Sequence, residues 1–236
     1  MEHQKHTSLK DMARILGVSI PTVSRALKDS PEISRELCAR AKQLAREMNY
    51  RPNPFAMSLR KNTPRIIGVV VPEIVTHFFS SILSGIEDMA IANGYFVIIA
   101  TSHELYEHEK RNIENLVNMR VEGIIACLSQ ETTDYRHFTT LSDINMPVVL
   151  FDRVCLPELF STVVADGVQS AQKATQHLLD NGSRRIAFIG GANHLDIVKR
   201  RKHGYLEALR ENKIPIEREL VVCRKIDYEE GKIATE

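Results

Sequence analysis

The chain has 236 residues, of which 43% are hydrophobic and 26% are charged, the composition of an ordinary globular protein. No apolar run approaches the roughly 18 residues of a membrane span, and the N-terminal "MEHQKHTSLKD" lacks the apolar stretch of a secretory signal, so neither a membrane protein nor an exported protein is expected. The net charge of +1 conceals an asymmetry, because residues 1–62 carry twelve Lys and Arg against six Asp and Glu, whereas the remainder carries nineteen against twenty-four. A basic head on a mildly acidic body indicates that only the head meets a polyanion; the alternative is a solvated helical surface.

The four cysteines do not form a metal-binding pattern. Cys38, Cys127, Cys155 and Cys223 are widely spaced and include no CxxC pair. Such spacing predicts reduced thiols in a cytoplasmic protein rather than a disulfide framework or a zinc site. We therefore expect no metal and no cofactor.

The first fifty residues predict three short helices. The first begins with Ser8 as N-cap and Asp11 three residues on, which is a capping box, and it ends at Gly17. The second begins after Ser19, and the third covers about 34–48. Two helices joined by a glycine turn are typical of a helix-turn-helix motif.

A helix-turn-helix places its second helix in the DNA major groove, with the first residues of that helix near base edges. Arg25 is able to donate two hydrogen bonds to guanine. Ile20 and Pro21 have no side-chain donors, so they contact thymine methyls or respond to DNA shape. The hydroxyl groups at Ser19, Thr22 and Ser24 suit phosphates. The positions that we expect to be exposed are Ile20, Pro21, Thr22, Ser24, Arg25 and Lys28. A small helical bundle without a ligand is the alternative.

The segment "RPNPFAMSLRKN" at 51–62 predicts a helix too short to be stable alone in water. Asn53 suits the N-cap of that helix, and Ala56 and Leu59 lie on one of its faces. Leu59 beside a basic residue fits a segment that folds on DNA and inserts an apolar side chain between base steps in the minor groove. The alternative is a plain linker whose leucine packs onto the body.

After residue 64 the pattern changes to strands that alternate with helices. The predicted strands are nearly continuous apolar runs, which indicates a parallel sheet covered on both faces. They lie at 65–71, 95–102, 123–129, 147–152, 161–166 and 184–191, and the clearest helices at 78–94 and 104–120. The part from 161 onward shows only two or three strands, fewer than a usual sheet.

The segments "SLKDMARILGVSIPTVSRALKDSPEIS…MNYRPNPFAMSLR" and "IIGVVVP" closely resemble the LacI/GalR family of bacterial transcription regulators. The body continues the likeness in "VEGIIACLS", "PVVLFDR" and "RRIAFIGG". The resemblance implies a sequence-specific regulator, most simply a repressor, that binds a palindromic double-stranded DNA operator as a homodimer and responds to a small molecule. By position, Ile20, Pro21 and Arg25 match base-reading sites, Tyr50 and Asn53 match backbone contacts, Ala56 matches a hinge contact, and Leu59 matches the leucine inserted at the operator centre.

The resemblance also implies the architecture: an all-α helix-turn-helix head, and an α/β body of periplasmic-binding-protein type with two Rossmann-like halves. The expected parts are the head at 1–50, the hinge at 51–63, the first half at 64–160 and a partial second half at 161–236. Phe78 and Phe79 match an aromatic pair at the effector cleft, and Asp152 and Arg201 match polar effector contacts. Such a set suits a sugar, but also a purine or an acid. Alternatively, the phenylalanines are ordinary core and Arg201 is a surface charge.

Chains of this family continue beyond "EEGKIATE", so the resemblance implies a C-terminally truncated chain with an incomplete second half. One alternative function is a regulator that binds DNA but has defective effector sensing or dimerisation. Another is a cytoplasmic small-molecule-binding protein. An enzyme is not expected, because GxSxG and P-loop motifs are absent and the histidines of "HELYEHE" are five residues apart rather than four. We interpret these two histidines, His103 and His108, as part of a solvated helix start.

Overall fold

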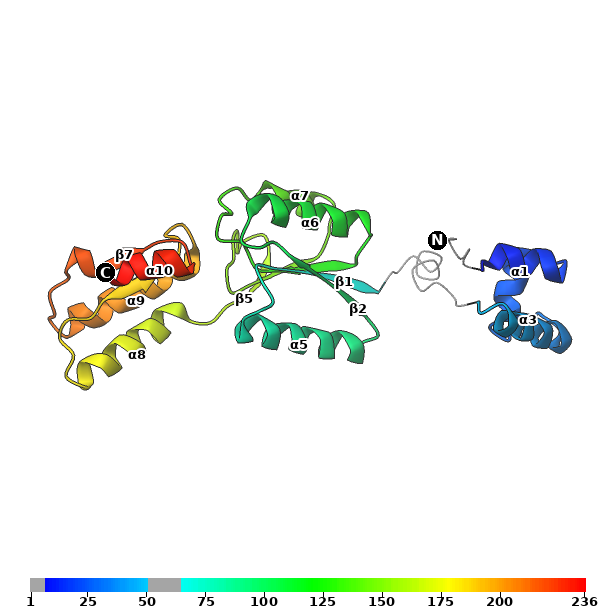
Figure 1. Cartoon of the computed structure of the whole chain (residues 1–236), viewed down its shortest axis with the longest axis horizontal. Coiled ribbons are helices and arrows are strands. Elements are labelled where there is room, and N and C mark those ends of the chain that lie inside the picture. The colour runs from blue at the N-terminus through cyan, green and yellow to red at the C-terminus, as the bar shows by residue number, and fades with distance from the viewer. Residues whose placement is uncertain (1–6, 51–64) are drawn as a thin grey trace. The chain divides into compact units, whose positions relative to one another are not determined.

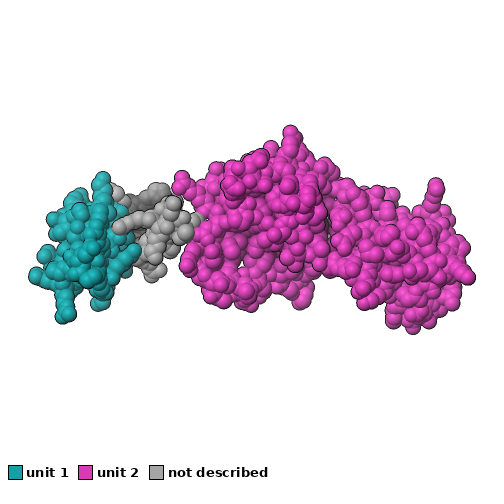
Figure 2. Space-filling model, turned by 180° about the vertical axis from the view of Figure 1, so that it is seen from behind, with its two compact units in different colours: residues 1–63 teal, residues 64–236 magenta. Residues whose placement is uncertain are grey.

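The computed structural model describes residues 7–50 and 65–236. The predictions for the hinge, which include Asn53, Ala56 and Leu59, lie outside these ranges. The chain divides into two compact units, Met1–Thr63 and Pro64–Glu236, which are coloured separately in Figure 2. Each unit is described here by itself.

The first unit contains the three predicted helices: α1 (Leu9–Leu16), α2 (Ile20–Ala26) and α3 (Arg35–Glu47). The capping box of α1 is present, and the turn after it has Gly17 in the left-handed region with φ 67°. The side chains of Ser19 and Ser34 accept hydrogen bonds from backbone amides in the first turns of α2 and α3. These caps satisfy amides that the helix itself leaves unpaired, which explains why the helices begin where the sequence predicts.

A small core holds the three helices of this unit together. Met12, Val23, Ala26 and Ala41 are fully buried, and they come from all three helices. Tyr50 packs against the same core after the end of α3. The opposite surfaces of the helices remain available to solvent.

The body contains a five-stranded parallel sheet in the order β2-β1-β3-β4-β5. Helices cover both of its faces: α5 lies on one side, and α6 and α7 lie on the other (Figure 1). The bounds are β1 (Ile66–Val71), α5 (His77–Ala92), β2 (Phe96–Thr101), α6 (Tyr106–Asn118), β3 (Gly123–Ala126), α7 (Arg136–Asp143), β4 (Val148–Phe151) and β5 (Ser161–Val163). The predicted α/β body with a parallel sheet is confirmed.

The residues of β1 explain this two-sided arrangement. Ile66 and Val70 face the core beneath α6 and α7, whereas Val69 and Val71 face the core beneath α5. All four side chains are at most 3% exposed. A strand that buries both sets of alternating side chains needs helices on both faces.

The remainder of the body packs α8 (Gly167–Asp180) against α9 (Asp196–Glu211), beside a two-stranded parallel sheet of β6 (Phe188–Gly190) and β7 (Val221–Cys223). The 3₁₀ helix η1 (Arg218–Leu220) and α10 (Tyr228–Thr235) complete the described elements. A second core forms there, and the Tyr205 hydroxyl within it donates to the carbonyl of Ile186 at 2.8 Å. None of the helices in the described ranges has the length and apolar character that a bilayer span requires.

The boundary that we predicted between the two halves is too early. The strand β5 was assigned to the second half, but it pairs with β4 and completes the sheet of the first half. The sequence shows where an apolar run lies, but not which strand it joins. The second half therefore begins after Val163.

Candidate functional site

The helix α2 presents the predicted reading residues on the side away from the head core. Ile20 is 41% exposed, and Pro21 and Arg25 are also exposed, as is Lys28 in the turn that follows α2. Thr22 is half-buried, and its hydroxyl lies 2.8 Å from that of Ser19. An apolar edge beside two cations is a surface suited to DNA bases and phosphates.

The prediction that Ser24 is exposed is wrong. Ser24 is only 8% exposed because it lies next to Val23, on the edge of the helix face that packs onto α1 and α3. We therefore omit Ser24 from the DNA-facing set.

Arg25 already has a partner in the absence of DNA. Its Nη1 lies 2.6 Å from Oε2 of Glu32, and both side chains are more than half exposed, at 52% and 66%. An exposed pair of this kind contributes about 0–1 kcal/mol to stability. A guanine edge can therefore replace Glu32 as the acceptor at little cost.

A cavity of about 530 Å³ lies between the two halves of the body and is lined by residues of both. Two hydrogen bonds bridge the halves at its edge. The Ile226 amide donates to Oε1 of Gln130 at 2.8 Å, and the Lys225 ammonium donates to Oε1 of Glu131 at 3.2 Å. The cavity is lined by Tyr106, Gln130, Glu131, Thr133, Asp134, Ala192, His194 and Lys225.

The four predicted effector residues are not among the residues that line this cavity. Asp152 directly follows β4 and is half-buried; burial raises its pKa above the ordinary value, and the charges of Arg153 and Arg201 oppose that shift without cancelling it. Arg201 is exposed on α9. Neither a hydrogen bond nor an ion pair joins Asp152 and Arg201 within the described ranges, so Arg201 acts on Asp152 only through its charge.

The two phenylalanines at the start of α5 differ in their surroundings. Phe78 is 49% exposed, as a ligand-contacting side chain requires. Phe79 is 5% exposed and packs in the core beneath α5, with its ring centroid 6.4 Å from that of Phe151. For Phe79 the structure favours the alternative of an ordinary core residue.

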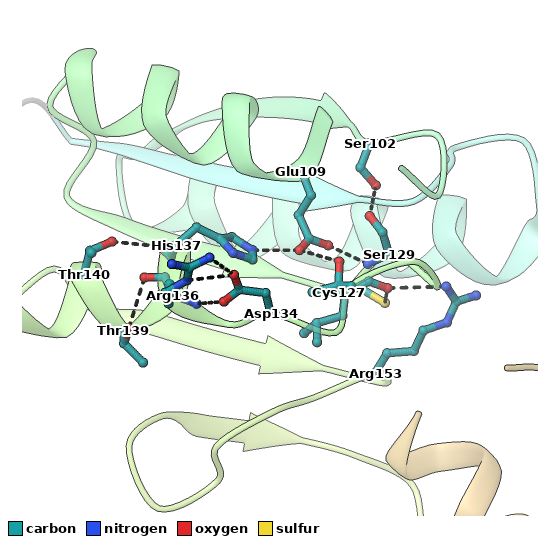
Figure 3. Close-up of polar contacts among 12 residues, drawn as sticks. Ser102, Glu109, Cys127, Ser129, Asp134, Arg136, His137, Thr139, Thr140 and Arg153 are labelled. Atoms are coloured by element: carbon teal, nitrogen blue, oxygen red, sulfur yellow. Dashed lines mark hydrogen bonds and ion pairs between the residues drawn. The ribbon is translucent and has the colours of Figure 1, made fainter. Parts of the chain in front are cut away.

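The sequence interpretation missed a buried polar cluster around the start of α6. The prediction of a solvated helix start concerned His103 and His108 and did not address Glu109. Glu109 is fully buried and receives hydrogen bonds from the Ser129 amide, the Thr132 hydroxyl and Nε2 of His137. Figure 3 shows its carboxylate between Ser129 and His137. The spacing of Glu109, Ile113 and Leu116 along α6 was the available signal, because these positions share one buried helix face.

A second carboxylate lies close to the first. Glu104 accepts from the Gln130 amide at 2.7 Å and from Nη1 of Arg153 at 2.6 Å. It stands in a turn where both His103 (φ 53°) and Glu104 (φ 62°) adopt the left-handed region, which costs a residue other than glycine about 1–3 kcal/mol. Such a turn persists only where its surroundings hold it. No group of three or more His, Cys, Asp or Glu side chains in the described ranges is arranged to hold a metal ion.

All four cysteines are free thiols. Cys38, Cys127 and Cys155 are buried, and Cys223 is half-buried. Burial raises the pKa of the Cys127 thiol, and it raises that of Cys155 to about 12. Thiols with raised pKa values are poor nucleophiles, so these two act as packing residues.

Two family models match the chain and together account for nearly all of it. Residues 8–53 match the bacterial regulatory proteins of the lacI family. Residues 65–236 match the periplasmic binding proteins and sugar binding domain of the LacI family.

Individual relatives agree with the family models. Catabolite control protein A of Priestia megaterium is 30% identical over 98% of this chain and 69% of its own length. The ribose operon repressor of Bacillus subtilis is 33% identical over 88% of this chain and 61% of its own length. The transcriptional repressor CytR of Escherichia coli is 31% identical over 96% of this chain and 66% of its own length. The chain thus spans about two thirds of the length of these relatives.

Solved structures show the same fold. The transcription regulator CcpA of Lactococcus lactis superposes with a TM-score of 0.66 at 31% identity, covering 71% of this chain and 61% of that chain. The regulator CelR in complex with cellobiose superposes with a TM-score of 0.65 at 25% identity, covering 97% of this chain and 69% of that chain. The lac repressor dimer bound to its operator superposes with a TM-score of 0.73 at 23% identity, covering 96% of this chain and 68% of that chain. At that identity the likeness concerns the fold alone.

Proposed function

The chain belongs to the LacI family of bacterial regulatory proteins, and on that premise we propose that it is a sequence-specific DNA-binding repressor whose affinity for an operator responds to a small molecule. The exposed edge of α2 and the turn after it carry this proposal, because Ile20, Pro21, Arg25 and Lys28 stand opposite a fully packed core. The relatives described above are transcription regulators, not enzymes.

We further propose that the chain acts as a homodimer in the cytoplasm, where its DNA target lies. A dimer places two copies of α2 on a palindromic site, because the symmetry of the protein then matches that of the operator. The support for a dimer comes from the family, in which the lac repressor was solved as a dimer on its operator.

We expect the protein to select a palindromic site from a random DNA pool. Its affinity for that site should fall steeply with salt, because each neutralised phosphate releases counterions. With about 6–10 phosphate contacts, the loss between about 50 mM and 200 mM salt is on the order of 10³ to 10⁵. Fluorescence anisotropy with the selected site measures this slope. If no DNA is retained from the pool at the lowest salt, the proposal is wrong.

Substitutions on α2 then separate base contacts from phosphate contacts. Arg25→Ala should cost about 1–3 kcal/mol and relax the preference at one base pair, whereas Lys28→Ala should weaken binding to all sequences alike. A uniform loss for Arg25→Ala would instead place Arg25 at a phosphate.

The cavity between the halves suits a polyhydroxylated ligand such as a sugar. Its lining combines carboxylates, an amide, a threonine hydroxyl, a lysine and the ring of Tyr106, groups that bond hydroxyls and cover an apolar ring face. The support from relatives is that CelR was solved with cellobiose and another family member with D-xylulofuranose. We propose that Asp152, Arg201 and Phe78 extend this site.

We expect a thermal-shift screen with cellobiose, ribose, xylulose and free purine bases to find a stabilising ligand. A ligand at a hundred times its Kd stabilises the folded protein by about 2.7 kcal/mol, which raises Tm by several degrees. Arg201→Ala should abolish the shift, whereas Arg210→Ala, an exposed arginine of the same helix, should preserve it. Equal shifts for the two variants would remove Arg201 from the site.

A further inference from the structure

Residues 128–132 follow β3 and, through Gln130 and Glu131, form one wall of the cleft between the halves. The strand β3 ends at Ala126, so the amides of Ser129 and Gln130 have no neighbouring strand to pair with. Both amides nevertheless have acceptors, because Ser129 donates to Glu109 at 2.5 Å and Gln130 donates to Glu104 at 2.7 Å. Two carboxylates from one turn and the helix that follows it therefore replace the missing strand.

The carboxylate of Glu109 fixes more than one point of this wall. Besides the Ser129 amide it accepts from the Thr132 hydroxyl at 2.8 Å and from Nε2 of His137 at 2.8 Å. An ionised carboxylate only accepts, so Nε2 of His137 carries the hydrogen. The Ser129 hydroxyl donates in turn to that of Ser102 at 2.6 Å. The wall is thus attached at its backbone and its side chains (Figure 3).

The same wall is the point at which the second half is joined. Gln130 is 7% exposed, and its side-chain oxygen accepts from the Ile226 amide 96 residues along the chain. Its neighbour Glu131 accepts from Lys225. The backbone of Gln130 is therefore held by the first half, while its side chain holds the second.

We propose that Glu109 and Glu104 are positioning residues for the cleft: they hold residues 129–131 in the one conformation from which Gln130 and Glu131 bond the second half. The two carboxylates thereby set how the halves close on a ligand. The inference rests on the proposed effector role of the cleft. The test of the inference needs neither DNA nor an effector. The inference can therefore fail while the proposed effector role of the cleft stands, and the reverse is also possible.

The chemistry of the site distinguishes positioning from simple packing. A fully buried carboxylate is costly to desolvate, and an apolar side chain of similar volume would fill the same space at least as well. What an apolar side chain does not provide is an acceptor for the Ser129 amide, the Thr132 hydroxyl and His137. The acid is therefore needed for the shape of the wall rather than for filling the core.

The test is single-residue amide hydrogen exchange, measured by NMR on the full chain with Glu109→Gln. The amide group of glutamine directs a donor at a site that needs an acceptor, so exchange at Ser129 and Gln130 should rise about tenfold. The decisive result is a comparable rise at Ile226, which Glu109 does not contact. Glu107→Gln removes the same charge from an exposed position of the same helix and should leave all three amides unchanged.

Two further variants show in which order the contacts from Glu109 to Ile226 act. They also keep the proposal testable if Glu109→Gln does not fold. Gln130→Ala should raise exchange at Ile226 but not at Ser129, because it removes only the bond to the second half. Thr132→Val, which removes one donor to Glu109 and retains the side-chain volume, should raise exchange at Ser129 and Ile226 by a few-fold. If the exchange rate of the Ile226 amide is unchanged in these variants, the proposal is wrong. It is also wrong if exchange rises equally at every core amide, because that would mean a general loss of stability.

Discussion

Replacing Gly204 with alanine will unfold the second half of the body, with a loss of about 3 kcal/mol or more in the free energy of unfolding. Gly204 lies where α9 crosses α8. A Cβ at this position would overlap the carbonyl oxygen of Val168 and lie 2.9 Å from its carbonyl carbon and 3.0 Å from the Gln172 amide nitrogen. All three are backbone atoms of α8, so no side-chain rotation relieves the overlap.

The consequence extends to the core beside the two helices. Tyr205 and Leu209 of α9 pack there with Leu179 of α8, so separating the helices exposes these buried side chains. Urea unfolding followed by circular dichroism measures the loss. Gly85→Ala in α5 is the matched control, because a Cβ there meets no described atom within 4 Å and alanine stabilises a helix interior by about 0.5–1 kcal/mol. Equal stabilities for the two variants would show that α8 and α9 move apart freely.

The features that the sequence predicted correctly are those that depend on near neighbours. Ser8 with Asp11, Ser19 and Ser34 each act within one turn of the helix that they begin, and the structure confirms all three helix starts. Apolar runs similarly predicted a parallel sheet, since a strand buried on both faces needs no information from distant residues. Local chemistry is sufficient at this level.

The features that were missed depend on residues far apart in the chain. The strand β5 was placed in the wrong half because its partner β4 is fixed by tertiary packing. The predicted strand at 184–191 is reduced to three residues of β6, which pairs only with β7 over that length. Glu109 was not recognised as a buried residue because its partners Ser129, Thr132 and His137 lie 20 to 28 residues away. Charge alone does not reveal burial when the compensating donors are distant.

The same distinction applies to the candidate sites. The exposed edge of α2 follows from helical periodicity, with the exception of Ser24 at the border of the buried face. The cleft has no such periodicity, because Tyr106, Gln130, His194 and Lys225 come from loops and helix starts in both halves. Resemblance to a family predicted Asp152 and Arg201 as effector contacts, whereas geometry was needed to find the residues that bridge the two halves.

Replacing Arg153 with methionine should destabilise the body by about 3–5 kcal/mol, the usual effect of removing one partner of a buried ion pair. Nη1 of Arg153 lies 2.6 Å from Oε2 of Glu104, with side chains only 9% and 23% exposed, and it also donates to the Leu128 carbonyl at 3.3 Å. Methionine keeps much of the apolar contact but leaves the Glu104 carboxylate without its cation. Urea unfolding of the two proteins measures the difference.

The exposed pair of Arg185 and Glu217 provides the control, with an N–O distance of 3.0 Å and side chains 67% and 36% exposed. Arg185→Met should change stability by about 0–1 kcal/mol because solvent screens the charges. Adding Glu104→Gln to Arg153→Met should recover part of the loss, since the uncompensated charge is then removed. If Arg153→Met costs no more than Arg185→Met, the Glu104 carboxylate is solvated. The turn at residues 103 and 104 would then have to be held by the Gln130 amide, which donates to Glu104, and by the His103 amide, which donates to the Pro72 carbonyl.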